Sequence, residues 1–120
     1  MAITPTAKIR VGDIAEIGFV VRTKTGALTS PTAVSIEITD HTGTLIETIT
    51  DADARVTIGA TLGTALAAEL GLSAAENTAG AGIVAVEVTP TAAGTWNVYC
   101  VSTGTVASES VNFKVWGKTE

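Results

Sequence analysis

Seven short segments of the chain alternate apolar and polar residues, and a period of two predicts β-strands. The clearest alternation begins at Val34, where Val34, Ile36 and Ile38 are separated by polar side chains. The seven predicted strands are residues 14–22, 34–39, 45–50, 55–58, 83–89, 95–102 and 110–116. Each is short, as expected of strands in a compact domain.

Turn residues separate these segments. Asp40 and Gly43 stand at the first and last positions of a four-residue stretch, which is the preference of a type I turn, so residues 34–39 and 45–50 are predicted to form a hairpin. No predicted strand is followed by a long amphipathic helix, which argues against parallel βαβ units. About seven short strands with regular turns predict an all-β, Ig-like antiparallel β-sandwich.

Residues 59–82 interrupt the strand pattern with an Ala/Gly-rich segment. Leu62, Leu66 and Leu70 recur every four residues, and a glycine follows where a helix would end. Ser73 and Glu76 then have the spacing of a capping box. We therefore expect a partly helical insertion containing two short helices.

The leucines of this insertion allow two interpretations. Leu62, Leu66, Leu70 and Leu72 form either an exposed apolar patch that binds a partner, or a cluster that folds back to cover an open end of the sandwich. Residues 1–10 show no periodicity and are predicted to be an N-terminal arm. The predicted partner-contact residues are Ile3, Pro5, Leu62, Leu66, Leu70, Leu72 and Trp116.

Composition narrows the classes of partner. A chain of 120 residues is the size of a single domain, here residues 1–120. Its net charge is −5 with only 7 Lys and Arg, which argues against nucleic acid and anionic membranes as partners. Cys100 is the only cysteine, so no disulfide can form within the chain, which fits assembly in a reducing cytoplasm. The N-terminus lacks the pattern of a signal peptide.

Candidate chemistry is sparse. His41 is the only histidine and lies in a predicted turn, and no nucleophile motif accompanies it. Cys100 is interpreted as a buried apolar residue. Asp51 and Asp53 lack the further oxygen ligands and the glycine of a calcium loop, so a solvated turn is favoured. We expect no catalytic, cofactor-binding or metal-binding residues and no cofactor, and the chain is not predicted to be an enzyme.

Four segments in order resemble a group of small Ig-like virion structural proteins of tailed bacteriophages. They are Val11-Gly12-Asp13, Ser30-Pro31-Thr32-Ala33-Val34, the Gly-Thr-Trp-Asn-Val-Tyr run from Gly94 to the Thr103-Gly104 turn, and the closing residues 109–115. The resemblance covers most of the chain except residues 59–82. Its shared positions are turn and core residues, so it transfers no functional residue.

The resemblance implies a function because such proteins are encoded among the virion genes of tailed bacteriophages. It implies a structural, non-enzymatic component of the virion, a head decoration or neck-tail accessory protein made in the host bacterial cytoplasm. Its partners would be the major capsid protein or neck and tail proteins, and a homo-oligomer is also compatible. The alternative is a carbohydrate or host-surface binding Ig-like module, which predicts an exposed aromatic cluster, although aromatic residues are only 4% of the chain.

Overall fold

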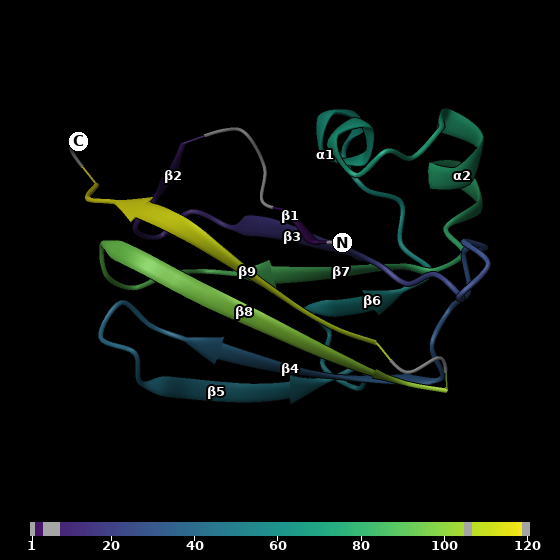
Figure 1. The fold of residues 1–120 in the computed structure, drawn as a ribbon. Coiled ribbons are helices and arrows are strands. Elements are labelled where there is room, and N and C mark those ends of the chain that lie inside the picture. The colour runs from purple at the N-terminus through teal and green to yellow at the C-terminus, as the bar shows by residue number, and fades with distance from the viewer. Residues whose placement is uncertain (1, 4–7, 105–106, 119–120) are drawn as a thin grey trace.

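The computed structural model describes residues 2–3, 8–104 and 107–118, and its described part is mostly β with two sheets (Figure 1). One sheet has the order β1 (Ala2–Ile3), β3 (Ala15–Val20), β7 (Ile83–Val88) and β6 (Val56–Ile58). The other has the order β2 (Ile9–Arg10), β9 (Ala107–Trp116), β8 (Gly94–Thr103), β4 (Ala33–Thr39) and β5 (Leu45–Thr50). This arrangement is compatible with the predicted all-β sandwich.

The N-terminal segment differs from the predicted arm. β1 pairs antiparallel with β3, whereas β2 pairs parallel with β9, so the chain contributes an edge strand to each sheet in turn. Each of the seven predicted segments contains a strand, and these two additional strands are only two residues long. A strand of two residues is too short to show a period of two in the sequence. Its position is set by pairing with a strand that is distant in sequence.

The main core lies between the two sheets. Ile17 and Phe19 of β3 pack in one cluster with Ile36 of β4 and with Trp96 and Val98 of β8, and all five side chains are at most 2% exposed. Burying an aliphatic or aromatic side chain of this size stabilises the fold by roughly 1.5–3 kcal/mol. The predicted inward face of β4 is therefore confirmed.

Trp96 brings a polar atom into this core. Its indole Nε1–H donates to the backbone oxygen of Ala92 at 2.9 Å, so the buried donor is satisfied four residues upstream. Since Ala92 lies in the connection before β8, the bond ties the start of this long strand to the preceding corner.

A β-bulge shapes the β4–β5 hairpin. Ile38 lies opposite Glu47 and Thr39 opposite Leu45, so Ile46 is an additional residue in β5. Leu45 and Ile46 are consecutive, yet they are 52% and 48% exposed. Glu47 lies opposite the inward-facing Ile38 and two residues from the buried Ile49, so it falls on the inward side, at the edge of the sheet.

Two six-residue helices, α1 (Thr64–Glu69) and α2 (Ala74–Ala79), follow β6, as predicted for the insertion. The capping box of Ser73 and Glu76 is confirmed, with both reciprocal hydrogen bonds present. The left-handed Gly71 ends α1, and Leu72 N–H donates to the carbonyl oxygen of Ala67, as in a Schellman motif. Neither described helix is long and apolar enough to span a membrane.

Candidate interaction surface

The helical insertion lies on the outer face of the four-stranded sheet (Figure 1). Leu62, Leu66, Leu70 and Leu72 are 4–8% exposed, and they form a second core cluster with Val20 and Ile83. Of the two interpretations, the leucines therefore fold back, but they cover a sheet face and not an open end of the sandwich. They are not an exposed apolar patch, because the outward residues of β3 and β7 take up their apolar surface.

Gly18 makes this packing possible. It is an outward-facing position of β3, and a Cβ placed on it would lie 2.9 Å from Cδ1 of Leu62 and 3.1 Å from Cδ1 of Leu70. Only a residue without a side chain leaves the two leucines room to lie against the strand.

Asn77 fixes α2 to the start of the insertion. Its amide Nδ2 donates to the Leu62 carbonyl at 2.9 Å, and its Oδ1 accepts from the Leu62 N–H at 2.8 Å. Both backbone groups of Leu62 are thus satisfied by one side chain, much as a neighbouring strand would satisfy them. Sequence reasoning missed Asn77, because a lone asparagine in a helix carries no signal of its distant partner.

The same segment is tied to the sheet below it. The Gly63 N–H donates to Oε1 of Glu16 on β3 at 3.2 Å. This bond adds a polar contact beside the buried leucines and helps to hold the entry to α1 in place.

A hollow of about 460 Å³ lies between the two helices and residues 61–62. Its floor contains the buried Leu62, Ala67 and Leu72, and its rim consists of small exposed side chains. The exposed rim residues are Thr61, Thr64, Ala68, Ser73, Ala74 and Thr78. The hollow is thus uncharged and mostly apolar.

The remaining predicted contact residues are placed only in part. The backbone of Ile3 lies opposite Gly18 in the β1–β3 ladder, and Pro5 lies outside the described residues. Trp116 is half-buried at the end of β9, where the Nζ atoms of Lys114 and Lys8 lie 3.6 and 4.1 Å from its ring centroid. Such distances define cation–π contacts.

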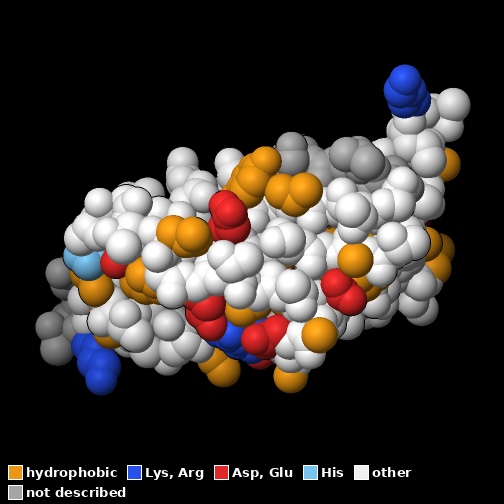
Figure 2. Space-filling view, turned by 90° about the horizontal axis from the view of Figure 1, so that it is seen from below, with side chains coloured by type: hydrophobic (Ala, Val, Ile, Leu, Met, Phe, Trp, Pro, Cys, Tyr) orange, Lys and Arg blue, Asp and Glu red, His pale blue; other side chains and the backbone are white. Residues whose placement is uncertain are grey.

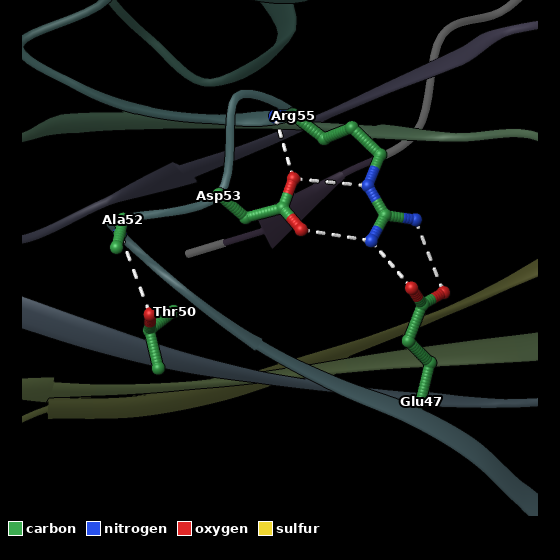
Figure 3. Close-up of polar contacts among 5 residues, drawn as sticks. All are labelled: Glu47, Thr50, Ala52, Asp53 and Arg55. Carbon is green, nitrogen blue, oxygen red and sulfur yellow. Dashed lines mark hydrogen bonds and ion pairs between the residues drawn. The ribbon is translucent and has the colours of Figure 1, made fainter.

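Glu47 and Asp53 have a structural role separate from that of Asp51, and Figure 3 shows these two residues beside Arg55. Asp53 accepts from Nε and Nη2 of Arg55 at 3.0 and 2.9 Å, and Glu47 accepts from both terminal nitrogens of the same guanidinium. Asp51 instead accepts from the backbone N–H of Val34 at 3.2 Å. Arg55 thus joins β5, the edge of one sheet, to the loop that enters β6, the edge of the other.

Hydrogen bonds within this cluster displace the acid–base equilibria. Bonds from the Arg55 side chain and backbone lower the pKa of Asp53 from 3.8 to about 2. Bonds from the Arg55 side chain also lower the pKa of Glu47, and the two carboxylates together raise the pKa of Arg55. All three groups are therefore charged at neutral pH and neutralise one another in part.

Cys100 and His41 are held far apart. Cys100 on β8 is 4% exposed and lies opposite Ile36 on β4, which confirms the prediction that Cys100 is buried. His41 is exposed in the β4–β5 turn, with its Cβ 2.5 Å from where a Cβ on Gly94 would lie. Gly94 begins β8, so six residues, or about 20 Å of strand, separate the two sites. A thiol nucleophile and a histidine base cannot meet in this arrangement.

The comparisons with known proteins add no family: the chain matches no protein-family model, no curated protein and no solved structure. Within the described ranges, no three His, Cys, Asp or Glu side chains gather as metal ligands.

Proposed function

We propose that the protein is a non-enzymatic structural component of a bacteriophage particle, an Ig-like decoration or accessory protein that binds the capsid or the neck and tail. The observation that carries the proposal is the strand order. Lettered in chain order as A, A′, B, C, C′, D, E, F and G, the strands form sheets ABED and A′GFCC′. These are the neighbours found in Ig domains, with the helix pair inserted between D and E.

The departures from antibody-type domains also fit this proposal. Strand F carries Cys100, whereas the inward positions of strand B are filled by residues such as Ile17 and Phe19, so the inter-sheet disulfide is replaced by apolar packing. Trp96 and its bond to Ala92 lie at the E–F corner, where many Ig domains use a tyrosine. A domain stabilised in this way needs no oxidising compartment.

The surface best suited to a virion partner is the rim of the hollow between α1 and α2. It is uncharged, its side chains are small, and the buried leucines beneath it hold it on the sheet. Small side chains on a supported helix pair allow close approach of a partner backbone and lose little conformational entropy on binding. The proposed contact surface is therefore this rim, in place of the predicted contact residues Leu62, Leu66, Leu70 and Leu72.

The alternative, a carbohydrate or host-surface binding module, has less support. An aromatic platform needs an open ring face, but Trp96 is buried and the ring of Trp116 lies against two lysines. Tyr99, on the outer face of the five-stranded sheet, is 36% exposed and lies between Glu37 and Ser110. One tyrosine is a small surface for a sugar.

Mass spectrometry of tailed particles purified from the organism that encodes the chain tests the proposal. We expect peptides of this protein in a fixed ratio to the major capsid or a tail protein. Abundance in the lysate with absence from the particles would contradict it, and selective binding on a glycan array would then favour the alternative.

The contact surface is tested separately by recruitment to particles that lack the protein. Thr64→Arg and Thr78→Arg place a long charged side chain on the rim and leave the buried leucines untouched. We expect both to lower occupancy, whereas Thr48→Arg on the exposed face of β5 serves as the matched control. Equal occupancy for all three variants would show that the contact lies outside the helix pair. It would leave open the proposal that the protein is a component of the particle.

A further inference from the structure

One end of this acidic domain carries an unusual concentration of cations. Of the 7 Lys and Arg residues, Lys8, Arg10, Lys114 and Lys118 belong to β2, β9 and the residues beside them. Arg10 lies opposite Trp116 in the parallel β2–β9 ladder, and a Cβ on Gly12 would lie 3.8 Å from Cε of Lys118. This end is remote from α1 and α2 (Figure 1).

Two of these cations contact the ring of Trp116. Lys114 Nζ and Lys8 Nζ lie 3.6 and 4.1 Å from the same ring centroid, so the two nitrogens are separated by no more than the sum of these distances. The negative face of an indole stabilises each ammonium, but the two ammonium groups still repel each other. A carboxylate that reaches both would remove that repulsion and gain two charge-assisted hydrogen bonds.

We propose that Lys8, Trp116 and Lys114 form a binding site for an acidic segment of a partner protein. Asp or Glu side chains of the segment contact the two ammonium groups, which lie over the half-buried indole at the end of β9. The site is distinct from the rim of the helix pair, and it does not depend on whether the protein belongs to a virion.

The charge of the rest of the molecule selects a short acidic segment over a larger polyanion. The chain carries a net charge of −5. On the side of the molecule shown in Figure 2, acidic groups are spread over the middle, and cations stand mostly near the two ends of the molecule. A nucleic acid duplex or an anionic bilayer would extend past the cationic end and meet this acidic surface. A short peptide contacts the cationic end alone.

The experiment measures binding of a fluorescent hexaglutamate peptide to the full chain by anisotropy at low salt. We expect saturable binding that weakens steeply between about 20 and 200 mM salt, because exposed charges are screened over about 10 Å at 0.1 M. The double variant Lys8→Gln/Lys114→Gln should weaken binding at least about fivefold, the equivalent of two exposed ion pairs. The charge-conserving Lys8→Arg/Lys114→Arg variant should retain it.

Lys24→Gln is the matched control, since it removes an exposed lysine from a turn outside this cluster. An equal loss of affinity in Lys24→Gln and in the double variant would overturn the site, as would the absence of binding at low salt. If inorganic phosphate displaced the peptide at a concentration that supplied the same total negative charge as the peptide, the assignment of an acidic protein segment would be overturned. The exchanged lysines are exposed, so circular dichroism should be unchanged in every variant.

Discussion

Gly18 and Leu62 meet across the outer face of the four-stranded sheet, with 2.9 Å between the Leu62 Cδ1 and the position of a Cβ on Gly18. One position without a side chain thus allows a helical insertion to lie directly on a β-strand. The insertion consequently belongs to the hydrophobic structure of the domain.

This relationship predicts that Gly18→Val destabilises the domain by about 1–3 kcal/mol, because the new methyl groups overpack the site of Leu62 and Leu70. Leu62→Ala alone should cost about 2–5 kcal/mol through the cavity that it leaves. Urea unfolding of the double variant should show a cost smaller than the sum, because valine fills part of that cavity. Strict additivity would mean that the two residues do not share one packing site.

Asn77→Ala should cost about 1–3 kcal/mol, since it leaves the N–H and carbonyl of the buried Leu62 without the amide that satisfies them. Thr78→Ala, one residue further along α2 and exposed, is the matched control and should cost less. Hydrogen exchange at the Leu62 amide should accelerate in the Asn77 variant only. Unchanged protection there would contradict the role given to the side chain.

Stability should depend on pH through Arg55. The folded-state pKa values of Asp53 and Glu47 are lowered, so their contribution is fully present above their ordinary values and is lost as the pH falls through the lowered ones. Urea midpoints of the wild type should therefore fall between about pH 5 and pH 2 more steeply than those of Arg55→Gln. The urea midpoints of the wild type and of Arg55→Gln should converge near about pH 2.

Lys24→Gln controls for the loss of one positive charge in this experiment, and it should follow the wild-type pH profile. High salt should reduce the difference between wild type and Arg55→Gln, because the three side chains are 30–38% exposed and solvent ions therefore screen their charges. Parallel profiles for wild type and Arg55→Gln at low salt would show that the guanidinium does not stabilise the ionised carboxylates.

Cys100 should react with a thiol reagent only when the sandwich opens. Its side chain is 4% exposed on β8, which has β4 on one side and β9 on the other. Native labelling should therefore follow the rate of unfolding, and denatured protein should label within the mixing time. Immediate labelling of native protein would place the thiol at the surface.

Local patterns in the sequence were sufficient for much of the fold. The alternation of Ile36 and Ile38 with polar residues predicted β4 and its buried face, and both are confirmed. Ser73 and Glu76 predicted the capping box, whose two hydrogen bonds are present. These features were predictable because the interacting groups are a few residues apart, so side-chain periodicity and spacing encode them directly.

The candidate surfaces were predictable only in part. The leucine spacing predicted a helix, but periodicity reports which residues share a face and not what that face contacts. Whether the leucines were exposed depended on Gly18 of β3 and on Ile83 of β7, which are distant in sequence. Trp116 was a predicted contact residue, yet its neighbour Lys8 comes from the opposite end of the chain.

By itself, the sequence determined the seven longer strands and the helix ends, because each depends on neighbours close along the chain. The residue type of Cys100 was enough to predict its burial. Tertiary structure alone decided the short strands β1 and β2, the pairing of Arg55 with Glu47, the contact of Gly18 with Leu62, and the two lysines on Trp116. These features join segments that are separated in sequence, and the register of the strands and the packing of the helices fix the distances between them.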